Sequence, residues 1–166
     1  MRRIRLIRNS PIDAFATTVY MQRERAYRLW LISPWIGGKE DRKSDPVQMM
    51  LDALRHNQRC RVTIVTREPR DSWHVAALLA LRAGLQPLIY YCNVLHTKLY
   101  IVEAQGFRSA VIGSPNLTMA GNRINVELAL ELRTTTESKD DDIAVAISEL
   151  TDYARKLLLE DDVILT

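Results

Sequence analysis

The sequence is poor in cysteine and contains no long apolar run. Its 166 residues include two cysteines, Cys60 and Cys92, which are too few for a disulfide framework and are expected to be free thiols in a reducing compartment. No stretch approaches the ~18 apolar residues of a membrane span, and the basic start of the chain lacks the apolar core of a signal peptide. These absences argue against a membrane-spanning or secreted protein, and we expect a cytoplasmic location.

Ligands for a metal ion are also scarce. The three histidines, His56, His74 and His96, stand at unrelated positions, and no carboxylates cluster near His96, whereas metal sites gather three or four such ligands. We therefore expect no metal and no cofactor. His56 is interpreted as a residue at the end of a helix, and His74 as a surface or packing histidine.

Lysine is rare, and arginine carries most of the positive charge. Five lysines stand beside 18 arginines. Residues 1–70 hold 15 basic and 7 acidic side chains, and residues 71–166 hold 8 and 13, which gives net charges of +8 and −5 and the overall +3. Arginine suits bidentate contacts to phosphate. The basic first half therefore favours a polyanionic substrate, although arginines on solvated helix faces account for part of the excess.

Three residues of the first half are candidate nucleic-acid contacts. Trp35 follows a predicted strand, at the strand end where ligands gather in open α/β sheets. It could stack on a base or be buried in part under a helix. Arg67 and Arg70 follow the next predicted strand, where they could contact phosphates.

Hydrophobic periodicity predicts alternating strands and helices followed by a run of strands. Helices are predicted at 10–28, 46–57, 71–82 and 140–159, and strands at 29–32, 61–67, 88–91, 96–102, 109–112 and 125–132. Ser10 is the expected N-cap of the first helix. In the last strand the polar alternate positions are typical of a solvent-exposed face. The pattern predicts a single-domain α/β sandwich over 1–166, with a mixed, largely parallel central sheet flanked by helices.

One stretch, His96 to Glu127, gathers residues that suit a phosphodiester. If 96–102 is a strand, His96 and Lys98 share one face with Cβ atoms about 7 Å apart, which places a nitrogen nucleophile beside a cation. Ser114 and Asn116 repeat the two-residue spacing on the following segment. A hydroxyl, an amide and a fixed positive charge can together hold phosphate oxygens.

This stretch resembles the signature of the phospholipase D superfamily. The shared pattern is H-x-K, four residues and an acid, followed by G-S-x-N at 113–116, and the continuation through Asn125-Val126-Glu127 is more similar to the nuclease branch than to the lipases. The family has aspartate where this chain has Glu103. Regular alternation puts Glu103 on the face opposite His96 and Lys98, so we expect a structural role for it.

The resemblance implies a metal-independent phosphodiesterase with a covalent phosphohistidine intermediate. His96 would be the nucleophile and Glu127 the carboxylate that orients it. Lys98, Asn116 and Ser114 would bind the phosphate oxygens. The family uses a second histidine from a second motif, and this chain has one copy. A homodimer that brings two His96 side chains together would supply it.

Other functions stay open at this point. A nuclease acting on DNA, rather than RNA, is favoured, and the family suggests a role in restriction or defence. Whether a partner ATPase or helicase licenses the enzyme is left open. The alternatives are a lipid phosphodiesterase, disfavoured by the absence of membrane-binding segments, and a nucleic-acid-binding or assembly module with a vestigial or partner-activated site.

Overall fold

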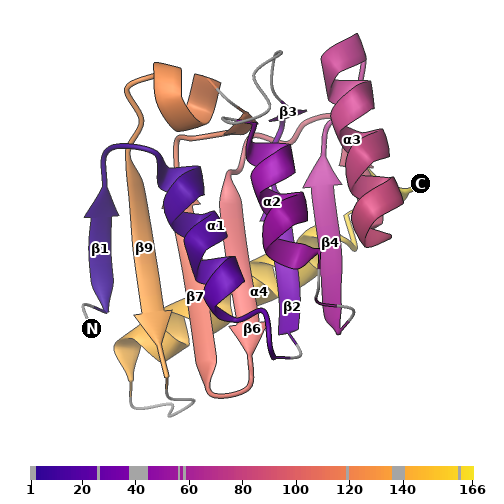
Figure 1. Cartoon of the computed structure of the whole chain (residues 1–166). Coiled ribbons are helices and arrows are strands. Elements are labelled where there is room, and N and C mark those ends of the chain that lie inside the picture. Colours follow the sequence, from indigo (N-terminus) through magenta and orange to yellow (C-terminus); the bar gives the residue numbers. More distant parts are fainter. Residues whose placement is uncertain are drawn as a thin grey trace.

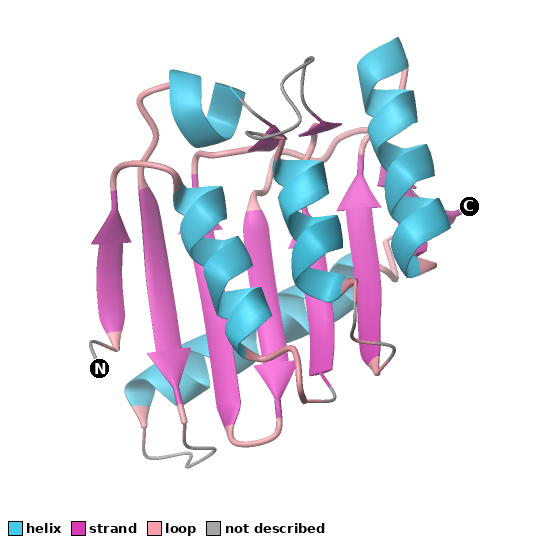
Figure 2. Cartoon of the chain, in the orientation of Figure 1, coloured by secondary structure: helices cyan, strands magenta, loops and turns pink. Residues whose placement is uncertain are grey.

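The structure, a computed structural model, is built around one eight-stranded sheet with helices on both faces (Figures 1 and 2). It describes residues 3–25, 27–37, 45–55, 57, 59–118, 120–135, 141–160 and 162–166. Three helices cover one face, namely α1 (Pro11–Met21), α2 (Pro46–Leu54) and α3 (Ser72–Leu85), and α4 (Asp142–Leu157) crosses the other (Figure 1). The α/β sandwich predicted from the sequence is confirmed.

The sheet is mixed, as predicted, but most of its pairings are antiparallel. Its strands, in spatial order, are β1 (Ile4–Ile7), β9 (Ala129–Thr134), β7 (Phe107–Gly113), β6 (Leu99–Ala104), β2 (Tyr27–Ile32), β4 (Cys60–Thr66), β5 (Leu88–Cys92) and β10 (Val163–Leu165). Within these described strands, β2, β4 and β5 pair in parallel and every other neighbouring pair is antiparallel. The expectation of a largely parallel sheet is wrong, because β6 and β7 form a hairpin and the two chain-terminal strands pair antiparallel at the edges.

Three of the four helices are shorter than the periodicity predicted, whereas α3 continues past the predicted end at Arg82 to Leu85. The first ends at Met21 rather than Arg28, because the chain turns at Gln22 before β2 begins. Asp45 caps α2 through Val47 N–H at 2.9 Å, and Asp141 caps α4 through two backbone N–H groups at 3.0 Å. His56 and most of the charged loop 39–45 lie outside the described residues. None of the helices formed by the described residues is long and apolar enough to cross a membrane.

The two faces of the sheet bury separate apolar clusters. Phe15 of α1 packs with Leu29 and Tyr100 on one face, and Ile147 of α4 packs with Trp30 and Ile101 on the other. Strand β2 is buried on both faces over residues 29–32, as is typical of a continuous apolar run. This places the middle of the sheet in the interior and leaves the strand ends for function.

The prediction for residues 125–132 is wrong in its start and in the face that it left to solvent. Strand β9 begins four residues later, at Ala129. Glu131, expected on a solvated face, is 1% exposed, whereas Leu128 on the apolar set is 52% exposed. Glu131 is held in the interior by ion pairs with Arg5 at 3.0 Å and Arg133 at 2.5 Å. Paired charges are the usual condition for burying a carboxylate.

Candidate active site

His96 and Lys98 lie in the segment that leads into β6 and not within the strand itself. A turn closed by Leu95 N–H to Cys92 O at 3.1 Å ends β5, and β6 begins at Leu99. The predicted strand 96–102 therefore starts too early. The backbone of Lys98 still pairs with the end of β7, through Gly113 N–H to Lys98 O at 3.4 Å. His96 is exposed and Lys98 is half-buried. Because Lys98 pairs with Gly113, the segment that carries His96 and Lys98 meets the loop 113–116 at one end of the sheet.

The loop 113–116 is fixed by hydrogen bonds from three separate segments. Ser114 N–H donates to Leu128 O at 3.1 Å, the Tyr100 hydroxyl donates to Pro115 O at 2.7 Å, and Leu117 N–H donates to the buried Ser33 Oγ at 3.0 Å. Strand β8 (Leu117–Thr118) then pairs in parallel with β3 (Ile36–Gly37). A loop held in this way presents Ser114 and Asn116 in a defined orientation.

Two glycines of the motif are required by close backbone contacts. A Cβ on Gly113 would lie 2.3 Å from Leu128 O, and a Cβ on Gly121 would lie 2.5 Å from Asn116 O. These contacts are with backbone atoms, which cannot move aside as the end of a flexible side chain can. The G-S-x-N spacing and the later glycine are therefore explained by packing as well as by chemistry.

Glu127 is positioned beside Ser114 rather than by a bond to His96. The Ser114 hydroxyl donates to Glu127, and Asn125 Nδ2 donates to its Oε1 at 3.1 Å. Burial raises the pKa of Tyr100, and the negative charge of Glu127 is a smaller cause of the same shift. Within the described chain His96 makes no hydrogen bond. A carboxylate has about four lone-pair sites, so Glu127 can accept a further donor.

Asn116 contributes an amide whose oxygen is enclosed. Its Oδ1 is buried and accepts no hydrogen bond from the described residues, although the residue as a whole is half-buried. A buried acceptor without a donor is costly. The described part of the chain contains no group of three or more His, Cys, Asp or Glu that could hold a metal ion, and Cys60 and Cys92 are free thiols.

Sequence reasoning missed the role of the turn after β8. Residues Ala120–Ile124 form a π-helical turn, and the buried Asn122 Oδ1 accepts from Ile12 N–H at 3.1 Å and Asp13 N–H at 3.3 Å. Asn122 thus caps α1 from a distant segment. Ser10, the predicted cap, makes no side-chain capping bond. A contact between residues about 110 positions apart leaves no local sequence signal.

A small hollow beside Glu127 adds an arginine to the neighbourhood of the motif. Its volume is about 340 Å³, and its lining consists of Arg8, Asn9, Ser10, Pro11, Asn122, Asn125 and Glu127. Arg8 follows β1, a strand that the sequence patterns did not predict. Its exposed guanidinium is a further candidate for phosphate binding.

The three candidate nucleic-acid contacts differ in their surroundings. Trp35 packs against Trp73 of α3, with ring centroids 6.4 Å apart, which agrees with partial burial under a helix. Arg67 stacks over Trp35 at 5.3 Å, and its Nε donates to Leu95 O, next to His96, at 2.9 Å. Arg70 is exposed. Arg67 therefore fixes the segment that carries His96, and Arg70 is the freer cation.

His74 is buried in this region and not on the surface. It is 0% exposed, stacks on Trp73 at 5.5 Å, and its Nε2 lies 3.2 Å from Thr66 Oγ1. The packing alternative predicted for this histidine is thus correct. Burial lowers its pKa, and Asp71 opposes that shift to a smaller extent.

We expect the stability of the protein to fall on acidification through the histidine range. The folded pKa of His74 is below its unfolded value, so below about pH 6.5 the unfolded chain binds a proton that the folded chain does not. Thermal melting at pH 7.5 and pH 5.5 measures the loss. In His74→Phe, which keeps an aromatic ring on Trp73 but cannot titrate, the difference should shrink. An unchanged difference would show that other groups cause it.

Glu103 lies at the other end of β6, away from this site. Trp30 Nε1 donates to its Oε2 at 3.1 Å, and Arg155 of α4 lies 3.5 Å from its Oε1. Trp30 belongs to the cluster on the α4 face, and Tyr100 to the opposite face. The exchange of aspartate for Glu103 thus falls at a position that touches α4 and not the loop 113–116.

Comparison with solved structures identifies the fold as that of the phospholipase D superfamily. Nuc, a phospholipase D family member from Salmonella typhimurium, matches with a TM-score of 0.67 and 12% identity over 98% of both chains. NucT from Helicobacter pylori matches with a TM-score of 0.66 and 12% identity, again over 98% of both chains. A phosphatidylserine synthase from Haemophilus influenzae gives a TM-score of 0.57 and 12% identity, over 98% of this chain and 39% of its own.

The similarity lies in the structures rather than in the overall sequences. No protein-family model and no curated protein matches this chain. The structural matches confirm the fold that was expected from the motif.

Proposed function

We propose that this chain belongs to the phospholipase D superfamily and is a metal-independent phosphodiesterase that cleaves nucleic acid, DNA in preference to RNA. The observation that carries the proposal is the meeting of His96 and Lys98 with the loop 113–116 at one sheet end, joined by the Gly113–Lys98 backbone contact. In the same fold, Nuc and NucT correspond to this chain over nearly their whole length.

The chemistry begins with attack of the neutral His96 imidazole on phosphorus. A phosphorus–nitrogen bond forms as the bond to the leaving oxygen breaks, and the leaving oxygen takes a proton from a second histidine. Lys98, Asn116 and Ser114 stabilise the negative charge that builds up on the non-bridging oxygens. Water, deprotonated by the second histidine, then releases the phosphate from His96. Glu127, held by Ser114 and Asn125, accepts the imidazole N–H.

The second histidine comes from a second copy of the chain. Supporting this, an apolar strip without a covering segment among the described residues runs beside Glu127 and consists of Ile124, Val126, Leu128 and Leu130, which are 36 to 104% exposed. Contiguous exposed apolar surface is typical of an interaction site. A two-fold axis near this strip would bring two His96 side chains to one substrate.

We expect Leu128→Glu to convert the dimer to a monomer and to remove cleavage with it. A charge on the strip would have to be buried without a partner, which is costly in an interface. Light scattering and a cleavage assay measure the two effects. Leu159→Glu is the matched control, because Leu159 is 82% exposed at the end of α4. A Leu128→Glu protein that stays dimeric and active would contradict the proposed interface.

Arg70 is expected to contribute a sequence-independent contact to nucleic acid. Arg70→Gln should weaken binding by a similar factor for all sequences and lower the slope of log affinity against log salt by about 1. Arg23→Gln, an exposed arginine at the end of α1, is the control. Equal salt slopes for both variants and the wild type would exclude this contact.

The nuclease proposal itself is tested in the presence of EDTA. The protein is incubated with labelled DNA and RNA, and cleavage without divalent metal is expected on DNA. Quenched reactions on a substrate labelled at the scissile phosphate should carry the label on His96 as an acid-labile, base-stable adduct. Cleavage that requires added magnesium, or label on another residue, would refute the mechanism.

A further inference from the structure

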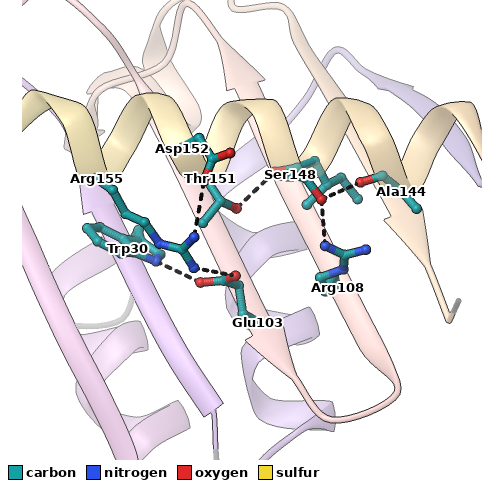
Figure 3. Close-up of polar contacts among 9 residues, drawn as sticks. Trp30, Glu103, Arg108, Ala144, Ser148, Thr151, Asp152 and Arg155 are labelled. Atoms are coloured by element: carbon teal, nitrogen blue, oxygen red, sulfur yellow. Dashed lines mark hydrogen bonds and ion pairs between the residues drawn. The ribbon is translucent and has the colours of Figure 1, made fainter. Parts of the chain in front are cut away.

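A row of charged residues crosses four strands at the sheet end away from the loop 113–116. The strand register places Arg61 of β4 opposite Arg28 of β2, Arg28 opposite Glu103 of β6, and Glu103 opposite Arg108 of β7. Paired residues on neighbouring strands point to the same face of a sheet. All four therefore lie on the face that α4 crosses, where Glu103 and Arg108 contact it (Figure 3).

The row forms the floor of an open hollow of about 720 Å³. Its lining is Tyr27, Arg28, Arg59, Arg61, Glu103, Ala104, Gln105 and Arg108, which sets four arginines against one glutamate. Burial raises the pKa of Tyr27 and raises that of Cys60, its cross-strand neighbour, to about 12. Both groups therefore stay neutral and add no negative charge.

Glu103 already has two partners, one on β2 and one on α4. Its two oxygens meet Trp30 Nε1 at 3.1 Å and Arg155 at 3.5 Å, and Arg108 donates to Ser148 Oγ at 2.8 Å (Figure 3). By contrast, the side chains of the exposed Arg28, Arg59 and Arg61 make no hydrogen bond or ion pair with any described residue. Two like charges directly opposite in a sheet oppose pairing, so an anion bound between Arg28 and Arg61 would offset their repulsion.

We propose that this hollow binds consecutive phosphate groups, with Arg28, Arg59 and Arg61 as the ligands. Guanidinium groups bind phosphate oxygens bidentately, and neighbouring strands hold Arg28 and Arg61 about 4.8 Å apart at the backbone. The same chemistry is offered by a nucleic-acid strand and by a free polyphosphate. The six residues of β2 separate the hollow from the candidate active site by about 16 Å. The proposal does not rest on the chemistry of His96.

The indole N–H signals of a ¹⁵N-labelled protein report on the two ends separately. Trp30 donates to Glu103 at the edge of the hollow, whereas Trp35 lies against Arg67 at the other end. We expect inorganic tripolyphosphate to shift the Trp30 signal in a saturable manner, and Trp30→Phe assigns that signal. A single-stranded oligonucleotide forms the second arm. A Trp30 shift with the oligonucleotide identifies nucleic acid as a source, and a shift with tripolyphosphate alone identifies a free polyphosphate.

Arg28→Gln/Arg61→Gln should weaken the Trp30 response at least tenfold. Arg23→Gln/Arg55→Gln removes the same charge from exposed positions outside the hollow and should leave the response unchanged. A Trp30 signal that neither ligand moves, or a double variant that titrates like the wild type, overturns the proposal. A wild-type protein that shifts Trp30 but cleaves nothing would refute the nuclease and leave this site standing.

Discussion

His96→Ala is expected to lower the cleavage rate by about 10³-fold or more, as when an enzyme loses its covalent catalyst. The fold should survive, because His96 is exposed and makes no hydrogen bond within the described residues. The variant is compared with the wild type in EDTA, and its melting temperature is recorded as the test of folding. His74→Phe serves as the control histidine, because the removed ring is buried outside the proposed chemistry.

Mixed dimers sharpen this test. When His96→Ala and wild-type chains are combined in one dimer, a single intact histidine cannot act as both nucleophile and acid in the first step. The mixed dimer should therefore be as impaired as the mutant homodimer. Half of the wild-type rate would show that each chain carries a complete site. Full activity of the His96→Ala homodimer would place the activity elsewhere.

Among the variants discussed, Glu131→Ala is expected to cause the largest loss of folding stability, about 3 kcal/mol or more. The carboxylate is 1% exposed and lies between Arg5 and Arg133, and Thr18 of α1 donates to it at 3.3 Å. Its removal takes away the carboxylate that Arg5 and Arg133 share. For a chain of this length such a loss corresponds to a fall in melting temperature of about 6–12 °C.

Glu149→Ala is the matched control for Glu131. Glu149 is an exposed acid on α4, and its removal should change the stability by less than about 0.5 kcal/mol. Both variants are measured by thermal and urea unfolding. If Glu131→Ala melted within a degree or two of the control, the buried ion pairs would contribute nothing beyond what apolar contacts supply.

Local sequence signals were sufficient for the centre of the sheet and for the motif. Strand β2 follows the apolar run 29–32, β4 and β7 contain valine and isoleucine, and α2 and α4 follow aspartate caps, so each carries its own signal. The motif could be located because its residues lie within one short stretch of the sequence, 96–127. Its geometry could not be predicted, since β6 begins at Leu99 and leaves His96 and Lys98 in the segment before the strand.

The faces of β9 show why periodicity alone was insufficient. Alternation separates Leu128 and Leu130 from Ala129 and Glu131, but it does not say which set is buried in the same chain. Glu131 is buried because Arg5 and Arg133 neutralise the charge of its carboxylate. An apolar set that stays exposed looks the same in sequence as one that fills the core. Strands β3 and β8, of two residues each, are too short to leave any pattern.

The two edge strands of the sheet, β1 and β10, each pair with a partner that is distant in the chain. Strand β1 joins β9, so that Leu6 meets Leu130, and β10 joins β5, so that Ile164 meets Tyr91. During synthesis β1 has no partner until residues 129–134 have left the ribosome, and β5 keeps a bare edge until β10 follows. Pairings of such long sequence separation close slowly. The interval exposes strand edges that can pair with other nascent chains.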